Sequence, residues 1–303
     1  MAFGLSDWLI KNPETGVAVR LPRKGSSEPR PFLQWVGGKR EMLSLFPNIL
    51  PHTYKKYHEP FLGGGAMLFH LKPEEAFVND SNVELIRTYR AVAENVEEVI
   101  ALLTLFKTRH SKELYLKTRA LDRSAEDFHQ FTDAEIAARL IYLNQTGFNG
   151  VYRVNKKGQY NVPIGSSLNK VICDPSALRA ASGFLNGYHF SSQDFHSAID
   201  HIDKGDFMYL DPPYVPVSEY SDFTRYTKDQ FGEDDQVRVH HLFSEANDKG
   251  CKVLLSNSDT SFIRELYKDF KITTITSSRN LNSHGMRRGH VNEVLVANYE
   301  VAV

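Results

Sequence analysis

A run of three glycines, Gly63, Gly64 and Gly65, is the feature that most constrains how this chain folds. The run follows a short segment at residues 57–62 that reads as a strand and precedes a helical segment at residues 66–71, so it predicts a tight strand-to-helix turn. Glycines permit positive φ and let a ligand approach the backbone closely. Fifteen residues after Gly65, Asp80 ends a second predicted strand, where its carboxylate could accept hydrogen bonds from ribose hydroxyls. This spacing is typical of a nucleoside-binding βαβ unit, although tight packing alone explains many such turns.

The turn indicates a cofactor that carries a nucleoside but no pyrophosphate. Residues 59–66 read EPFLGGGA, which is neither the GxGxxG dinucleotide fingerprint nor a phosphate-binding loop ending in GK[ST]. S-adenosylmethionine is a ligand of this kind. Lys39 at a predicted helix start could pair with the carboxylate of such a cofactor, and Trp35 could pack near its sulfonium. A core tryptophan and a surface lysine explain these two residues more simply.

A second constraint is the DPPY sequence at residues 211–214, which follows an apolar strand predicted at residues 207–210. Neither Pro212 nor Pro213 has an N–H and each fixes φ, so the corner keeps its shape and its carbonyls can face a ligand. Asp211 and Tyr214 on such a corner could hold a planar amino group by hydrogen bonds and stack the attached ring. An ordinary strand-ending turn is the alternative.

Strands alternate with helices along most of the chain, which predicts an α/β sheet. Between residues 83 and 172 the pattern changes, because apolar residues recur at helical spacing up to about residue 144 and a hairpin or ordered loop rich in Asn, Gly, Tyr and Lys follows. We therefore expect a polar tail at residues 1–29, a sheet domain formed by residues 30–82 and 173–303, and a mostly helical insertion at residues 83–172. The remaining expected elements are a helix ending near residue 46 and strands at residues 76–80, 188–190, 252–256, 272–275 and 294–299.

Composition narrows the class of protein. The 303 residues carry a net charge of −1 with 24% charged residues, as in a soluble globular protein. Cys173 and Cys251 lie far apart without a CxxC pattern and the histidines are scattered, so we expect neither a disulfide scaffold nor a metal site. No apolar run approaches the roughly 18 residues of a membrane span. Residues 139–170 hold five Lys or Arg and no acid, and residues 279–290 hold three arginines and no acid; both stretches could track phosphates or be solvated loops.

Five motifs together resemble the Dam-type DNA adenine-N6 methyltransferases of the D12 class. In chain order they are WVGGK at residues 35–39, EPFLGGG at 59–65, NQTGFNGVYRVN at 144–155, NVPIG at 161–165 and DPPY at 211–214. The similarity covers roughly residues 30–300. It implies a Rossmann-like S-adenosylmethionine-dependent methyltransferase sheet in which the inserted helical block is a DNA target-recognition domain. Gln34 stands where the family often carries a lysine.

The resemblance implies roles for individual residues. The residues that it matches to cofactor contacts are Trp35, Gly37, Lys39, Phe61, Gly63, Gly65, Asp80, Asp194, Phe195 and Asp211. The catalytic group consists of Asp211, Pro212, Pro213 and Tyr214. The expected DNA contacts are a wedge formed by Phe148 and Asn149, base readers of a GATC site at Val151, Arg153 and Pro163, and a phosphate contact at Lys156.

Residue chemistry indicates how such an enzyme would act. Adenine N6 is unreachable inside a duplex, so the base must leave the stack. Tyr214 would then stack on the flipped base, while the Asp211 carboxylate and the Pro212 carbonyl accept the two N6 hydrogens. Residues 223–226 are expected to form a loop over the base. Residues 256–258, after another strand, could line the same pocket or form a simple turn.

The expected partner is double-stranded DNA, inside a prokaryotic cytoplasm or encoded by a phage, with no membrane partner. A cognate restriction endonuclease could belong to the same system without forming a stable complex. Two alternatives stay open. Methyltransferases acting on RNA adenine or on a protein glutamine amide also use an (N/D)PPY corner, but they lack the helical insertion with its NGVYR segment. A non-catalytic DNA-binding protein with this fold would not need an intact DPPY.

Overall fold

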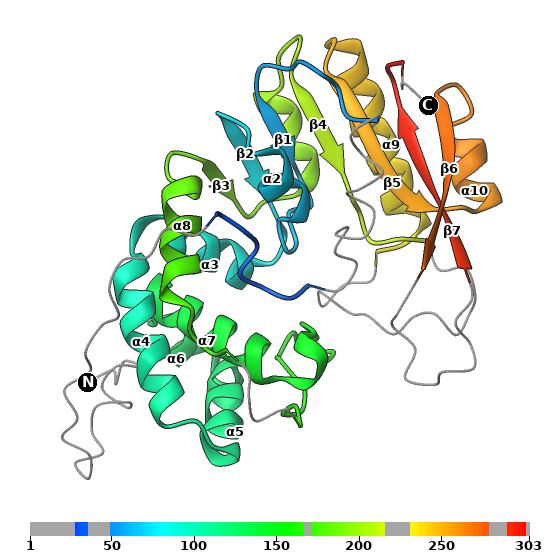
Figure 1. The fold of residues 1–303 in the computed structure, drawn as a ribbon. Helices are drawn as coiled ribbons and strands as arrows, with labels where there is room; N and C mark the ends of the chain where they lie inside the picture. The colour runs from blue at the N-terminus through cyan, green and yellow to red at the C-terminus, as the bar shows by residue number, and fades with distance from the viewer. Residues whose placement is uncertain (1–27, 36–48, 167–170, 216–230, 279–289, 301–303) are drawn as a thin grey trace.

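The computed structural model describes residues 28–35, 49–166, 171–215, 231–278 and 290–300, and its main element is a seven-stranded sheet (Figure 1). The strand order is β3-β2-β1-β4-β5-β7-β6. The first five strands in this order run parallel: β3 (His189–Ser191), β2 (Ala76–Asn79), β1 (Tyr57–Glu59), β4 (Phe207–Leu210) and β5 (Lys252–Ser258). Strand β7 (His290–Ala297) is antiparallel to β5 and to β6 (Lys271–Ser278).

Side chains that alternate along the strands divide the core into two clusters. Phe207 and Tyr209 of β4 belong to one cluster, and Met208 and Leu210 belong to the other. All four residues are buried, which explains why β4 is uniformly apolar. The cluster of Met208 and Leu210 also contains side chains of α9 (Glu233–Asp248), α10 (Ser261–Leu266) and the 3₁₀ helix η5 (Phe195–His201). The cluster of Phe207 and Tyr209 contains side chains of α2 (Ala66–Leu71) and of the helices described next.

A block of helices gathers beside the β1–β3 half of the sheet (Figure 1). It comprises α3 (Val83–Glu94), α4 (Val96–Thr108), α5 (Lys112–Ala120), the 3₁₀ helix η3 (Leu121–Arg123), α6 (Ala125–Phe128) and α7 (Asp133–Thr146). Helix α7 packs against α3, α4 and α5, so side chains on almost its whole circumference are buried. A capping box between Thr132 and Glu135 sets its start, because each side chain bonds the backbone N–H of the other residue. Helix α8 (Pro175–Leu185) packs on α3 and α4 and leads to β3.

Residues 151–165, called here the basic hairpin, fold back on themselves after the short 3₁₀ turn η4 (Phe148–Gly150). Antiparallel bridges join Val154 to Tyr160 and Gly147 to Ile164. A turn between Asn155 and Gln159 closes the hairpin; its Gly158 has φ +76°, a conformation that favours glycine. The hairpin or ordered loop expected here is confirmed.

Most elements expected from the sequence are present. The α/β sheet, the helical block up to residue 146 and the strand at Phe207–Leu210 are confirmed. The last strand was placed too late, because β7 covers His290–Ala297 and not residues 294–299. The helix expected to end near residue 46 lies outside the described residues. The division into domains stays a prediction; α8, beyond the expected boundary at residue 172, packs with the helical block in the same hydrophobic cluster. Within the described part of the chain, no helix is both long enough and apolar enough to cross a membrane.

Candidate active site

Four of the predicted site segments follow the carboxyl ends of the parallel strands. The glycine turn (residues 63–65) follows β1, Asp80 follows β2, Asp194 follows β3 and the proline corner (residues 211–214) follows β4. Since these strands are parallel neighbours, their carboxyl ends lie at one edge of the sheet. The strand order reverses between β1 and β4, and in open α/β sheets a ligand binds at such a switch point.

The glycine turn is bonded to Asp80. Gly63 and Gly65 have φ of +48° and +65°, which L side chains adopt rarely. The Gly63 N–H donates to Asp80 Oδ2 at 2.9 Å, and the Asn82 N–H donates to Asp80 Oδ1 at 2.9 Å. Burial raises the pKa of the Asp80 carboxyl, and these two N–H donors oppose the shift. The carboxylate is therefore fixed in orientation beside the turn, and its role as an acceptor for ribose hydroxyls stays a prediction.

Trp35 packs directly on the glycine turn. A Cβ atom built on Gly64 would lie 2.7 Å from Trp35 Cβ, and one built on Gly63 would lie 3.0 Å from Trp35 Cδ1. Any side chain at either position would displace the indole. The indole also stacks on the ring of Tyr152, at a centroid distance of 5.1 Å and an interplanar angle of 20°. Trp35 thus joins the glycine turn to the basic hairpin.

Phe61 and Phe195 meet beside the turn. Their ring centroids are 5.0 Å apart, and both rings contact Phe231 at about 6 Å. The guanidinium of Arg238 lies 4.7 Å from the Phe195 centroid and forms an ion pair with Asp194 at 2.6 Å. Burial raises the pKa of Asp194, but hydrogen bonds and charge from Arg238 and His196 lower it overall. The structure therefore brings Phe61, Asp194 and Phe195 together, and it adds Arg238 and Phe231, which the sequence did not indicate.

Hydrogen bonds from β5 hold the acid of the proline corner. Ser256 Oγ donates to Asp211 Oδ1 at 2.8 Å, and Tyr209 Oη lies 2.9 Å from the same Ser256 Oγ. Ser256 and Tyr209 are buried, so water does not compete for these bonds. Ser256 thereby orients one carboxylate oxygen of Asp211. From the sequence, residues 256–258 could have lined the pocket or formed a simple turn.

Amide side chains fix the rest of the corner. Gln236 Nε2 of α9 donates to the Pro213 carbonyl at 2.7 Å, and Asn257 Nδ2 donates to Gln236 Oε1 at 2.9 Å. Asn257 Oδ1 also accepts from the N–H of Val215 at 3.3 Å. Gln236 and Asn257 are both buried, and Asn257 Oδ1 accepts a further bond from the N–H of Ser258 in its own strand. In the sequence, the only signal for these two residues was that Gln236 lies in an amphipathic segment and Asn257 ends a mainly apolar one.

The ring of Tyr214 is anchored at its hydroxyl. Tyr214 Oη donates to Glu293 Oε2 of β7 at 2.8 Å. Burial raises the pKa of Tyr214 well above its usual value, and the charges of Asp211 and Glu293 add to this shift. Glu293 is a buried acid within the apolar run of β7, and sequence reasoning missed it.

The basic hairpin and the turn η4 before it carry the predicted DNA-contacting residues, most of them exposed. Phe148 is 48% exposed, Asn149 has φ +54°, and Arg153, Lys156 and Pro163 are exposed, whereas Val151 is half-buried. Arg153 Nε donates to Asn161 Oδ1 at 2.8 Å and Nη2 to the Asn161 carbonyl at 3.4 Å. Since a guanidinium has five N–H donors, these bonds orient it and leave others for an acceptor.

Arg139 of α7 supports the hairpin from within the helical block, through Asp122. Its side chain is 1% exposed and forms ion pairs with Glu84 and Asp122. Asp122 Oδ2 in turn accepts the N–H of Tyr160 at 2.7 Å, so the ion pairs continue into the hairpin. Arg119 and Arg123 add bonds to the carbonyls of residues 162 and 160. In the sequence, Arg139 was counted among basic surface residues; that reading of Arg139 is wrong, because α7 is central to the helical block and its arginine points inward.

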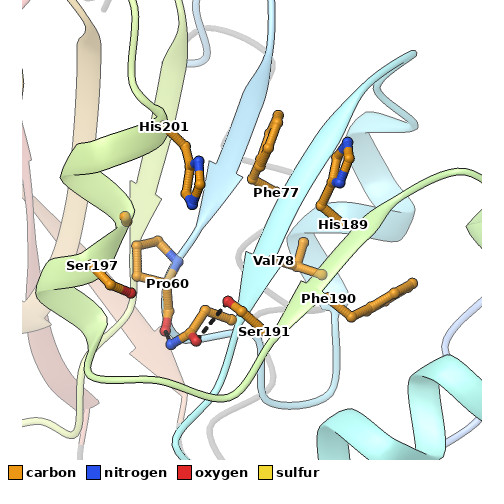
Figure 2. A pocket seen from close by; sticks show the side chains of 10 residues that line it. Pro60, Phe77, Val78, His189, Phe190, Ser191, Ser197 and His201 are labelled. Atoms are coloured by element: carbon orange, nitrogen blue, oxygen red, sulfur yellow. Dashed lines mark hydrogen bonds between the residues drawn. The ribbon is translucent and has the colours of Figure 1, made fainter.

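Figure 2 shows a cavity of about 140 Å³ on the sheet face next to η5. The rings of Phe77, His189 and His201 stack along it. The centroid of the Phe77 ring is 4.3 Å from that of His189 and 5.3 Å from that of His201. Its polar lining includes Ser191, bonded to Asn79. No residue of the predicted catalytic, cofactor or DNA set lines this cavity.

Several predicted residues lie outside the described part of the chain. They are Gly37 and Lys39 of the cofactor set, the loop at residues 223–226, and the basic residues His284, Arg279, Arg287 and Arg288. Among the described residues, no group of three or more His, Cys, Asp or Glu is placed to hold a metal ion.

The parallel sheet with its reversed strand order, the glycine turn bonded to an acid and the proline corner at the same edge define a methyltransferase-type α/β site. The comparison with protein families agrees. Residues 35–281 match the model of the D12 class N6 adenine-specific DNA methyltransferases, and the chain belongs to this family.

Relatives cover nearly the whole chain. It is 42% identical to the Type II methyltransferase M1.LlaDCHI of Lactococcus lactis over 93% of this chain and 99% of that protein. It is 36% identical to the Type II methyltransferase M.MjaIII of Methanocaldococcus jannaschii over 90% of this chain and 100% of that protein. It is 30% identical to the DNA adenine methylase of Haemophilus influenzae over 90% of this chain and 96% of that protein. The chain is thus an adenine-specific DNA methyltransferase, and the recognised resemblance is confirmed.

Proposed function

We propose that this enzyme transfers a methyl group from S-adenosylmethionine to N6 of an adenine that has been flipped out of a DNA duplex, within a GATC site. The observation that carries the proposal is the Asp211 carboxylate, which Ser256 orients at the same sheet edge as the glycine turn and Asp80. An oriented acceptor next to a nucleoside-binding turn suits the activation of an amino group beside a methyl donor.

The residues of the site fit S-adenosylmethionine. Asp80 offers carboxylate oxygens for ribose hydroxyls, and Phe61 and Phe195 offer aromatic faces for an adenine ring. Gly63 and Gly65 hold positive φ, so the backbone of the turn is open to close approach. Trp35, Gly37, Lys39, Asp194 and Asp211 complete the proposed contacts. The cofactor would supply an electrophilic methyl group.

The corner residues would hold the target amino group. Asp211 and the Pro212 carbonyl would each accept one N6 hydrogen, which turns the nitrogen lone pair towards the donor. The Pro213 carbonyl is engaged by Gln236, which supports assigning the substrate contact to Pro212. The Tyr214 ring would stack on the base, with its hydroxyl held by Glu293. Orientation of this kind can contribute about 7–11 kcal/mol to the lowering of a barrier.

The basic hairpin would recognise the duplex around the target. Phe148, an exposed ring next to the strained Asn149, is suited to wedge into the stack that the adenine leaves. The Arg153 guanidinium, oriented by Asn161, is suited to guanine O6 and N7 in the major groove. Val151 and Pro163 would contact neighbouring bases, and Lys156 would contact a phosphate. We also propose residues 83–172 as the target-recognition domain.

The relatives named Type II methyltransferases support a role in a restriction-modification system, in which a cognate endonuclease would share the site without a stable complex. Such systems, and solitary methylases alike, act on DNA in the cytoplasm of prokaryotes or of phage-infected cells.

A transfer assay with tritiated S-adenosylmethionine tests the proposal. The substrates are a duplex with one GATC site, four duplexes with single-base changes in that site, the matching RNA duplex and a glutamine-containing protein. We expect label in the GATC duplex and, after digestion, in N6-methyladenine. Equal label in all five DNA duplexes would reject the site, and label confined to RNA or protein would reject the proposed substrate.

A further inference from the structure

Tyr152 lies between the two proposed base readers Val151 and Arg153, yet its own side chain is only 5% exposed. Its ring stacks on Trp35 on one side and meets Tyr160 edge-on at 5.7 Å on the other. Because Trp35 packs on Gly63 and Gly64, a continuous column of contacts runs from the glycine turn through Trp35 and Tyr152 to the second strand of the basic hairpin.

The far end of the Tyr152 side chain reaches the start of α3. Its hydroxyl lies beside Asn82 and Glu84; the charge of Glu84 adds to the effect of burial in raising the pKa of Tyr152. The Asn82 N–H donates to Asp80, the proposed ribose acceptor. Glu84 forms an ion pair with Arg139, which anchors the hairpin. A second set of contacts therefore connects the region of Asp80 with the hairpin.

A third link fixes the backbone at both ends of this column. Asn144 of α7 accepts from the Gln34 N–H and donates to the Gln34 carbonyl, each at 2.8 Å. The same Asn144 amide donates to the Gly150 carbonyl at 2.8 Å. Position 150 leaves no room for a side chain beside Gln34, because a Cβ there would lie 2.0 Å from Gln34 Oε1. Asn144 therefore joins the segment before Trp35 to the turn that leads into the hairpin.

We infer that Tyr152 is a positioning residue that couples the cofactor turn to the base-reading hairpin, so that cofactor and cognate DNA each strengthen the binding of the other. The inference rests on the proposed function, since it requires the cofactor at the glycine turn and DNA at the hairpin. Tyr152 itself is too buried to contact DNA, and its effect passes through the backbone of Val151 and Arg153. Coupling between two sites is reciprocal, so it can be measured from either side.

The test measures binding and needs no turnover. The dissociation constant of a fluorescent GATC duplex is determined by anisotropy with and without saturating S-adenosylhomocysteine, for the wild type, Tyr152→Phe, Tyr152→Leu and Tyr152→Met. The constant for S-adenosylhomocysteine is determined by calorimetry with and without the duplex. Tyr188→Leu is the matched control, because Tyr188 is a partly buried tyrosine before β3, at the opposite end of the strands.

For the wild type we expect each ligand to strengthen the other by about 5-fold or more. Tyr152→Leu should bring this factor close to 1, while each ligand alone binds within about 3-fold of wild type; Tyr152→Phe keeps the ring and should keep most of the coupling. Tyr152→Met, whose unbranched and flexible side chain adapts better to the space left by the ring, serves if the leucine variant does not fold. Wild-type coupling in the Leu and Met variants, or a factor of 1 in the wild type, would overturn the inference and leave the proposed function intact. Failure of the wild type to bind either ligand would instead overturn both.

Discussion

The proline corner and the basic hairpin are held in place by different kinds of interaction. The corner is an extension of β4, and three neutral side chains, Ser256, Asn257 and Gln236, bond its acid and its backbone, while one acid, Glu293, holds the Tyr214 hydroxyl. The hairpin lies on helices, and the charged groups Arg139, Asp122, Arg119 and Arg123 anchor it. Its exposed face carries the side chains proposed to meet DNA.

This difference separates the chemistry from the choice of site. The acid proposed to hold an amino group is oriented by the buried Ser256, and a small displacement there would be costly. The side chains proposed to choose a sequence stand on a hairpin whose own surface is solvated and which helices of another part of the fold anchor. Changes to the two regions should therefore affect different measurements.

Asp211→Ala should have the largest effect. It removes the oriented acceptor, and we expect methyl transfer to fall by roughly 10³-fold, while duplex binding changes little and cofactor binding weakens but stays measurable. Single-turnover transfer and anisotropy provide the two measurements. A variant that turns over at the wild-type rate would exclude the corner from the reaction.

Arg139→Ala should strongly destabilise the anchor of the hairpin. It leaves the largely buried Glu84 without its cation and Asp122 with Arg123 alone, which we expect to cost about 3–5 kcal/mol in the free energy of unfolding. Urea unfolding measures the loss. Lys268→Ala, which breaks an exposed pair with Glu265, is the control and should unfold like the wild type. Equal stability of the two variants would show that the ion pairs of Arg139 do not stabilise the fold around the hairpin.

Ser256→Ala tests the support behind the acid. A hydrogen bond to a charged group is worth about 1.5–3 kcal/mol, so kcat should fall roughly 10–100-fold with the KM for DNA unchanged. Tyr209→Phe removes the next hydroxyl in the same chain of bonds. If the two act as one unit, the double variant should lose less than the sum of the single losses. Additive losses, or a change confined to KM, would contradict a positioning role.

Arg153→Ala and Lys156→Ala separate base reading from phosphate contact. We expect Arg153→Ala to lose about 1–3 kcal/mol of discrimination between GATC and a site with a changed guanine. Lys156→Ala should instead weaken binding to all duplexes alike and lower the salt dependence by about one counterion. The ratio of methylation rates on the two sites, and binding at several salt concentrations, distinguish them. Identical effects of both variants would remove Arg153 from the base-reading role.

Glu59→Gln should have the smallest effect and a defined pH dependence. Burial raises the pKa of Glu59 well above 4.5, with smaller contributions from the charges of Asp211 and Asp80. The folded state therefore favours the protonated carboxyl, and this stabilisation is complete below pH 4.5 and is lost as the pH rises through the raised pKa. Since glutamine cannot ionise, the stability of the variant relative to the wild type should increase in urea unfolding as the pH rises above 4.5 towards the raised pKa. A pH-independent difference would show that Glu59 is charged in the fold.

Local sequence predicted the elements that present the site. The acid after β2 and the proline pair after β4 come at the ends of their strands, while three residues separate the glycines 63 to 65 from β1, which is shorter than the expected strand at residues 57–62; strand ends are readable from local patterns. The supporting residues were harder to predict, because Ser256, Gln236 and Glu293 lie on elements far from Asp211 and Tyr214 in the chain. Nothing in the local pattern around Arg139 distinguishes a buried arginine from a surface one.

By itself, the sequence determined the family, the glycine turn, the proline corner and the hairpin with its arginine, because each is a local run of residues with its own backbone preferences. Only the tertiary structure decided how these runs are connected: which oxygen of Asp211 is bonded from behind, which acid holds Tyr214, and that Tyr152 stacks between Trp35 and Tyr160. The physical reason is that such contacts depend on strand order and helix packing, which bring distant residues within a few ångströms, whereas the pattern along the chain specifies only neighbours.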